Sequence, residues 1–271
     1  MRQIFDLTGK IALVTGGAGI IGSQVVRGLA EFGAVVIIAD INKDKGESLA
    51  QELNIELNAN KAYSCFVDVT SEESVQNMVS YVQNKFNSID ILHNNAAGKS
   101  NDLDAFFKEF EEYDLEQWKD IMDADLTSMF LVAREVGKVM KQQEIKGSII
   151  QTASIYAVVA PDQRIYEGSY YLDREINTPA VYSTAKSGVI GLTKYLSAYW
   201  GKSGIRVNAI TPGGIESGQN DTFKHKYSER VPLGRMAKAE EMVGAVVYLA
   251  SDASSYVTGQ NIIVDGGLSV W

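Results

Sequence analysis

The chain has 271 residues, 45% of them hydrophobic, a single cysteine and a formal net charge of −9. This length and apolar content are sufficient for one large buried core, whereas the acidic balance and the lack of a basic tract exclude nucleic acid and an anionic membrane as partners. A cytoplasmic protein is expected, because the apolar runs are too short to cross a bilayer, the first residues do not resemble an export signal, and the lone Cys65 leaves no internal disulfide.

Short apolar runs alternate with stretches of helical periodicity along the whole chain. Most of the runs are apolar throughout, as in a parallel sheet that is buried on both faces. The expected strands are Ile11–Thr15, Val35–Asp40, Ala62–Val69, Ile89–Asn95, Ser148–Ser154, Arg206–Thr211 and Asn261–Asp265, and the expected helices are Gly22–Phe32, Ser71–Phe86, Leu115–Glu144, Val181–Lys202 and Ala239–Ser251. The alternation predicts an α/β fold over residues 1–271: one Rossmann-type domain with a seven-stranded, parallel, doubly wound sheet flanked by helices.

Two polar segments do not fit this minimal pattern. Pro161–Thr178 interrupts the path from the fifth strand to its helix, and Gly214–Arg230 follows the sixth strand. Both come after the carboxyl ends of strands, where open α/β sheets bind ligands. We therefore expect two substrate-binding loops at about residues 161–178 and 214–230, the first of them part of a lid. The alternative is an ordinary surface loop or interface element.

A glycine-rich turn joins the first strand to the first helix. Gly17, Gly19 and Gly22 have the G-x-G-x-x-G spacing of a dinucleotide-binding turn, in the strand–turn–helix context that this motif requires. Glycines let the backbone approach a pyrophosphate, which then lies at the positive end of the helix. A merely tight turn is the alternative for the glycines taken alone.

Acidic residues end the second and third strands. The Asp40 carboxylate is placed to bind the adenosine ribose hydroxyls and to repel a 2′-phosphate, which favours NAD over NADP. Lys43 lies close enough to weaken this preference. Asp68 either caps the helix that follows it or points towards the adenine side of the same crevice.

Tyr182 and Lys186 are four residues apart in an expected helix, so they share one face. A lysine ammonium beside a phenol stabilises the phenolate, which makes a tyrosine usable as a general acid or base near neutral pH. The spacing alone also occurs on ordinary solvated helices, and it gains meaning from the features around it.

Taken together, these residues resemble the short-chain dehydrogenase/reductases over nearly the whole chain. The matching features in chain order are the glycine turn, Asp68-Val69, Asn94-Asn95-Ala96-Ala97, Ser154, Tyr182 with Lys186, Asn208 with Pro212-Gly213-Gly214, and Val264-Asp265-Gly266-Gly267. A finer resemblance, to the flagellin modification protein A-like sugar oxidoreductases of nonulosonic-acid pathways, is carried by Ala153–Tyr156, Pro161–Gly168 and Val231–Met236.

The resemblance implies a catalytic role for four residues. Tyr182 would donate or accept the proton at the substrate oxygen, Lys186 would bind the nicotinamide ribose, and Ser154 would hydrogen-bond the reacting oxygen. Asp125 stands where the family has an asparagine that supports a water relay to the lysine. A carboxylate there would either preserve the relay or hold Lys186 in an ion pair.

The resemblance also implies binding residues for a nicotinamide cofactor and a substrate. The expected cofactor residues are Gly16, Gly19, Ile21, Gly22, Asp40, Ile41, Asp68, Val69, Asn94, Ala96, Tyr182, Lys186, Pro212, Gly213, Ile215 and Ser217. The expected substrate residues are Ser154, Arg164, Tyr166 and Arg174, whose charged donors and aromatic rings suit a polar, anionic sugar derivative. No metal is expected, because His93 and His225 are the only histidines.

The function expected from the sequence is that of an NAD(H)-dependent oxidoreductase that interconverts a secondary alcohol and a ketone. A homodimer or homotetramer would form through Leu115–Glu144 and Val181–Lys202, as in the family. Two alternatives remain open at this point. One is an epimerase-like or dehydratase-like enzyme with tightly held NAD, suggested by the position of Gly19; the other is a non-catalytic nucleotide-binding protein, against which the intact Ser154, Tyr182 and Lys186 argue.

Overall fold

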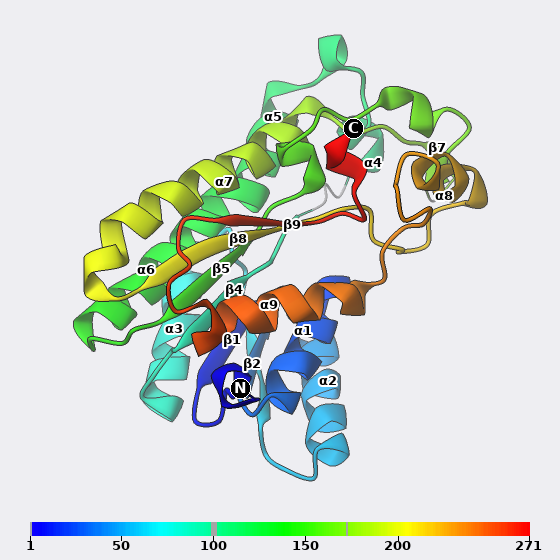
Figure 1. Ribbon diagram of the computed structural model, residues 1–271. Coiled ribbons are helices and arrows are strands. Elements are labelled where there is room, and N and C mark those ends of the chain that lie inside the picture. The colour runs from blue at the N-terminus through cyan, green and yellow to red at the C-terminus, as the bar shows by residue number, and fades with distance from the viewer. Residues whose placement is uncertain (1, 99–101, 172) are drawn as a thin grey trace.

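The computed structural model describes residues 2–98, 102–171 and 173–271. Within these ranges a seven-stranded sheet has the order β3-β2-β1-β4-β5-β8-β9, and every neighbouring pair of its strands is parallel (Figure 1). The strands are β1 (Ile11–Thr15), β2 (Val35–Asp40), β3 (Ala62–Phe66), β4 (Ile91–Asn94), β5 (Ser148–Thr152), β8 (Arg206–Pro212) and β9 (Asn261–Val264). The predicted single-domain, doubly wound fold is confirmed.

Helices cover both faces of the sheet, because successive apolar residues of a strand point to opposite sides. Val14 of β1 packs on one side with α1 (Ile20–Glu31), α2 (Lys43–Glu56) and α9 (Val243–Ala250). Leu13 packs on the other with α3 (Glu72–Phe86), α6 (Ser128–Gln142) and α7 (Ala180–Trp200). The central strands are thus buried on both faces, and ligands can approach only at the strand ends.

The sequence pattern missed two features of the helices. Helix α2 was not expected; it begins after Asn42, whose side chain accepts the Lys45 N–H, and it is predominantly polar apart from a buried stripe that includes Leu49 and Leu53. The expected helix over 115–144 is instead α5 (Leu115–Met122), a π-helical turn at Asp123–Thr127, and α6.

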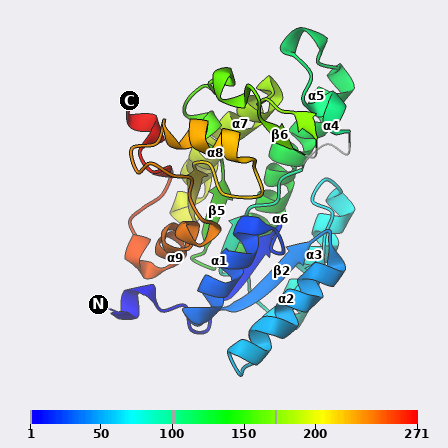
Figure 2. The same cartoon turned by 90° about the vertical axis from the view of Figure 1, so that its right-hand side faces the viewer.

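The two polar segments lie at the same end of the sheet, beyond the carboxyl ends of its strands (Figures 1 and 2). The first contains a 3₁₀ turn at Gln163–Tyr166 and an antiparallel hairpin of β6 (Tyr170–Tyr171) and β7 (Arg174–Glu175). The second contains α8 (Asp221–Ser228), whose Phe223 and Tyr227 join Ile165 and Tyr166 in a small apolar cluster. The remaining short segments are helix α4 (Leu103–Phe106) and 3₁₀ turns at Arg2–Phe5, Phe110–Glu112, Ile155–Ala157, Gly201–Ser203, Ala239–Met242, Asp252–Ser254 and Leu268–Val270.

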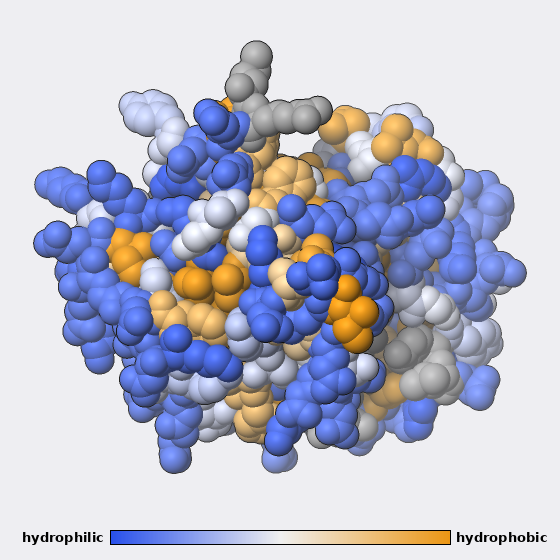
Figure 3. Space-filling model, turned by 90° about the horizontal axis from the view of Figure 1, so that it is seen from below, coloured by the Kyte–Doolittle hydropathy of each residue, from blue (hydrophilic) through white to orange (hydrophobic). Residues whose placement is uncertain are grey.

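The surface is mainly hydrophilic on the face that Figure 3 shows. Hydrophilic side chains cover most of the face seen in Figure 3, with apolar residues in small groups between them. Among the described residues, no helix is both long and apolar enough to cross a membrane. Cys65 is half-buried rather than fully buried, and burial raises the pKa of its thiol to about 11, so it stays protonated at neutral pH.

Candidate active site

The glycine turn between β1 and α1 forms a close-packed cradle. Gly16 has φ +62°, and a Cβ there would lie 2.9 Å from Cα of Ala96. A Cβ on Gly22 would lie 2.0 Å from the Gly16 carbonyl oxygen, so the start of α1 meets the turn backbone to backbone. Because the first N–H groups of a helix have no intrahelical partner, this turn offers donors and a positive dipole end to an anion. The site therefore fits the pyrophosphate of a dinucleotide.

Asp40 is fixed at the end of β2 by two backbone donors. Its Oδ2 accepts the Ala18 N–H at 3.0 Å, and its Oδ1 accepts the Asn42 N–H at 2.9 Å. The exposed Ile41 follows it. A carboxylate held beside the glycine turn is an acceptor that fits the hydroxyl groups of a ribose.

The strand ends next to Asp40 are also held by polar side chains. The Asp68 carboxylate accepts from both the N–H (3.0 Å) and the hydroxyl (2.7 Å) of Thr70, which is the geometry of a local turn. A role for Asp68 and Val69 towards adenine stays a prediction. The Asn94 amide is buried and donates to Gln151 at 2.8 Å, so only its backbone is available to a cofactor.

A cleft of about 310 Å³ brings the predicted catalytic residues together. Ser154, Tyr182 and Lys186 all line it. Ser154 lies two residues after the end of β5, and its Oγ accepts the Tyr156 N–H at 3.3 Å. Tyr182 and Lys186 come from consecutive turns of α7, with Nζ of the lysine 5.8 Å from the centroid of the tyrosine ring. Besides Tyr182 and Lys186, four further expected cofactor residues line the same cleft: Ile21, Pro212, Gly213 and Ile215.

Asp125 lies behind this group in the π-helical turn and is fully buried. Its Oδ2 is 3.8 Å from Nζ of the buried Lys186, and its Oδ1 accepts the Gly98 N–H at 2.9 Å. Burial raises the pKa of the Asp125 carboxyl, against the opposing effects of the Lys186 charge and the Gly98 hydrogen bond. Of the two possibilities that the sequence left open, the geometry is that of an ion pair, longer than a direct hydrogen bond.

We expect Asp125→Asn to retain at least part of the wild-type activity. The amide keeps an acceptor for the Gly98 N–H and the same shape, and it removes only the charge next to Lys186. The measurement is kcat across a pH series, with Asp123→Asn in the same turn as a control, because Asp123 is exposed. Complete loss of activity in a folded Asp125→Asn protein would show that the carboxylate itself takes part, and an acidic limb in the wild-type pH–rate profile would then belong to it.

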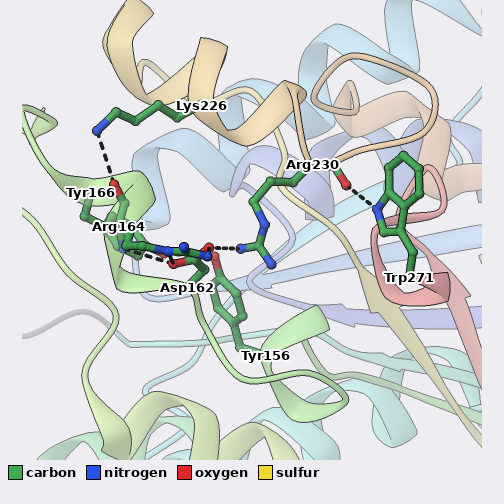
Figure 4. Close-up of polar contacts among 7 residues, drawn as sticks. All are labelled: Tyr156, Asp162, Arg164, Tyr166, Lys226, Arg230 and Trp271. Carbon is green, nitrogen blue, oxygen red and sulfur yellow. Dashed lines mark hydrogen bonds and ion pairs between the residues drawn. The ribbon is translucent and has the colours of Figure 1, made fainter.

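Of the predicted substrate residues, Ser154 and Tyr166 line the cleft and the two arginines do not; Figure 4 shows Arg164 and Tyr166. Tyr166 lines the cleft, and its hydroxyl bonds with that of Tyr156 at 2.9 Å and also with Thr178. Arg164 and Arg174 do not line it. Arg164 forms two hydrogen bonds of 2.8 Å with Asp162 and is 85% exposed, and Arg174 pairs with Asp104. A role for these two arginines towards the substrate stays a prediction.

Sequence reasoning missed three aromatic residues that line the cleft: Tyr156, Phe223 and Tyr227. Tyr227 accepts the Gly214 N–H at 2.5 Å, which ties α8 to the loop after β8. Burial raises the pKa of Tyr227 to about 12 and raises that of Tyr156 further, so both phenols stay neutral. The spacing of Phe223 and Tyr227, four residues apart in a polar segment, was the available signal. Ser217, an expected cofactor residue, is exposed outside the cleft and bonds with Gln219.

One of the two histidines lies in the core of the sheet. His93 is fully buried in β4, bonds with Thr152 at 2.9 Å, and has its pKa lowered to about 3 by burial. Among the described residues, no group of three or more histidines, cysteines and carboxylates could hold a metal ion.

Known proteins match the chain along almost its whole length. The family described as "Enoyl-(Acyl carrier protein) reductase" matches residues 16–269. The D-threitol dehydrogenase of Mycolicibacterium smegmatis is 33% identical over 275 residues, covering 98% of this chain and 95% of that protein.

Two solved structures are similarly close. A short-chain dehydrogenase from Leptospira borgpetersenii with bound NAD⁺ has a TM-score of 0.84 at 33% identity, covering 97% of this chain and 94% of that one. A gluconate 5-dehydrogenase from Burkholderia cenocepacia, in complex with NADP and tartrate, has a TM-score of 0.87 at 30% identity, covering 100% and 99%.

Proposed function

The chain belongs to the short-chain dehydrogenase/reductase family, and from this premise we propose that it is an NAD(H)-dependent oxidoreductase of hydroxyl-rich, sugar-like substrates. It would interconvert a secondary alcohol and a ketone. The observation that carries the proposal is that Ser154, Tyr182 and Lys186 line one cleft, together with the end of β8 at Pro212 and the residue after it, Gly213. In this proposal, a nicotinamide bound at Pro212 and Gly213 would lie next to the proposed proton-transfer groups.

The chain's own residues would handle the proton and the orientation of the substrate. When bound, the nicotinamide supplies the hydride chemistry. The Tyr182 hydroxyl would donate a proton to the substrate oxygen during reduction and accept it during oxidation. Ser154 would hydrogen-bond the same oxygen, and the Lys186 ammonium would stabilise the phenolate of Tyr182. The buried position of Lys186 strengthens that electrostatic effect.

A hydroxyl-rich substrate suits the walls of the cleft. Tyr156, Tyr166 and Tyr227 place phenol groups around the space next to Ser154, with Gln219 beside them. Such groups offer both hydrogen bonds and aromatic faces to a polyol. The dehydrogenases named for threitol and gluconate among the relatives support this class. A substrate from nonulosonic-acid or flagellin-glycan pathways stays a prediction that rests on the finer resemblance of residues 161–168.

The proposal is tested by NADH-linked absorbance with a panel of polyols, aldonic acids and the corresponding ketones. Turnover of a secondary alcohol by the wild-type protein supports it. The proposal is wrong if a folded protein that binds NADH turns over no member of the panel.

NAD is proposed over NADP because of Asp40. The relatives do not decide this point, since one similar structure holds NAD⁺ and another NADP. We expect Asp40→Ala, combined with Ile41→Arg, to narrow or reverse a preference for NAD by removing the repulsion of a 2′-phosphate. The ratio of kcat/KM for the two cofactors measures this.

Two further variants distinguish the effect of the Asp40 charge from the effect of its hydrogen bonds to the backbone. Asp40→Asn removes the charge and keeps an acceptor for one of the two N–H groups, of Ala18 or Asn42, so it should narrow the preference for NAD with a smaller loss of stability than Asp40→Ala. Asp44→Asn changes a carboxylate in the first turn of α2 and should leave the ratio unchanged. Equal efficiency of the wild-type enzyme with NADP(H) would contradict the assignment of Asp40.

A homodimer or homotetramer is also proposed. Helices α6 and α7 expose large aromatic side chains, including Phe130, Tyr195 and Tyr199, and the last two stack at 5.9 Å. Exposed aromatic surface of this kind is typical of interfaces between subunits.

A further inference from the structure

The cleft carries almost no charge. Among the described residues that line it, Lys186 is the only charged side chain, and it is engaged by Asp125 at 3.8 Å. Because an anion buried without a counter-charge is strongly disfavoured, a carboxylate or phosphate on a substrate has no partner deep in the cleft. The anionic group of the substrate would have to lie at the entrance of the cleft, next to the two polar segments.

Most cations of these segments are already matched by carboxylates. The Arg164 side chain makes two hydrogen bonds with Asp162, and Arg235, which follows the second segment, makes two with Glu241, at 2.6 and 2.7 Å. Likewise, Arg174 pairs with Asp104, and Lys226 lies 3.9 Å from Glu167. A ligand would have to displace these carboxylates before it could use the donors.

Arg230 is different. Its guanidinium is 3.5 Å from Asp162, at the limit of a hydrogen bond, and Arg164 already satisfies that carboxylate. Figure 4 shows the two guanidinium groups approaching Asp162 from different sides. The guanidinium of Arg230 donates no hydrogen bond to the residues that the structure describes, and its side chain is 36% exposed. Nη1 of Arg230 faces Asp162, whereas Nε and Nη2 keep donors that are available to a ligand.

Arg230 also lies next to the cleft. Its positive charge lowers the pKa of each of three phenols that line the cleft, Tyr156, Tyr166 and Tyr227, although burial raises all three overall. Its backbone is fixed on both sides: the N–H donates to the Tyr227 carbonyl, and the carbonyl accepts from Nε1 of Trp271 at 2.9 Å (Figure 4). Arg230 is not itself a lining residue of the cleft, but its fixed backbone holds it one hydrogen bond away from Tyr227, which is.

Resting on the function proposed above, we infer that Arg230 is a specificity-determining residue that binds a carboxylate or phosphate at the end of a hydroxylated substrate. The planar guanidinium matches both groups through two parallel hydrogen bonds. The reacting hydroxyl would lie at Ser154 and Tyr182, and the charged end of the same molecule would lie at Arg230. The substrate class is thus a sugar acid or sugar phosphate rather than a neutral polyol.

The test compares three probes. D-Gluconate carries a terminal carboxylate, D-glucitol 6-phosphate carries a terminal phosphate, and D-glucitol is neutral. We expect Arg230→Gln to lower kcat/KM by about tenfold or more for the probe whose anionic end Arg230 binds, because a hydrogen bond to a charged group is lost. The loss should appear mainly in KM, as expected for binding outside the reacting centre. D-Glucitol should change by less than about twofold. The two anions distinguish a carboxylate from a phosphate, and Arg230→Lys, which keeps the charge and loses the planar fork, should fall between.

The variant Asp162→Asn distinguishes two possible roles of Arg230: binding the anionic group of the substrate, and stabilising the loop through its ion pair with Asp162. If Arg230 only braced the loop through Asp162, removing either partner would cause the same loss. If Arg230 binds the substrate, Asp162→Asn leaves the affinity for the anion unchanged or improves it, and the amide can still cap the Arg164 N–H. Lys224→Gln removes one positive charge from α8 as the matched control.

Three results would overturn the role of Arg230: equal losses for the neutral and charged probes, equal losses in Arg230→Gln and Asp162→Asn, or no preference of the wild-type enzyme for either anion. Turnover of D-glucitol without such a preference leaves the oxidoreductase function standing. If a folded wild-type protein oxidises none of the probes, the function fails on its own. Calorimetric titration of NADH-loaded wild-type and Arg230→Gln protein with D-gluconate and D-glucitol 6-phosphate then decides the role of Arg230 separately, and absence of binding of both to the wild type overturns it.

Discussion

Replacing Tyr182 by phenylalanine is expected to lower kcat by about 10²–10⁴-fold, the usual contribution of a general acid or base. The ring stays on α7, so its packing next to Lys186 is kept and only the transferable proton is lost. Affinity for NADH should stay within a few-fold of wild type. Steady-state kinetics and NADH fluorescence titration give the two quantities.

The matched control is Tyr256→Phe, the same change at a fully exposed tyrosine outside the cleft. It should leave kcat unchanged. An activity loss of less than tenfold in Tyr182→Phe would contradict the assignment of the proton-transfer group.

Replacing Lys186 by alanine is expected to damage catalysis and cofactor binding together, because one ammonium is proposed to serve both. It should also destabilise the fold, since Asp125 would be left as a buried carboxylate without its counter-charge. Breaking a buried ion pair by removal of one partner typically costs about 3–5 kcal/mol. NADH affinity, kcat and thermal unfolding are the three readouts.

The double variant Lys186→Ala with Asp125→Asn separates these effects. It removes the buried charge, so it should recover part of the lost stability while its activity stays low. A Lys186→Ala protein with weakened NADH binding but an unchanged kcat would show that the lysine holds the cofactor and takes no part in proton transfer.

The sequence was sufficient for the sheet because its strands are continuous apolar runs. Strands β1 and β2 have the predicted residues at both ends. Helix α2 escaped notice because few of its residues are apolar and only one stripe is buried. The π-helical turn at Asp123–Thr127 could not be predicted from the sequence, because one widened turn barely changes the spacing of apolar residues along a helix.

The grouping of the proposed catalytic residues could be predicted because each lies in a short local motif. Ser154, Tyr182 and Lys186 are fixed by a strand end and a helix spacing, and the cleft brings them together. The pairing of Arg174 with Asp104 joins parts of the chain that are 70 residues apart. No local pattern reveals such a partner, and for the same reason the open donors of Arg230 became visible only in the folded chain.

The most direct test of the central claim is the stoichiometry of NADH and ketone formed from a single polyol or aldonic acid by the wild-type enzyme. An oxidoreductase that releases its cofactor is predicted to form one NADH for each ketone, with both products absent in Tyr182→Phe. Conversion of the substrate to an epimer or a dehydrated product without net NADH, by protein that retains its cofactor through gel filtration, would contradict the account.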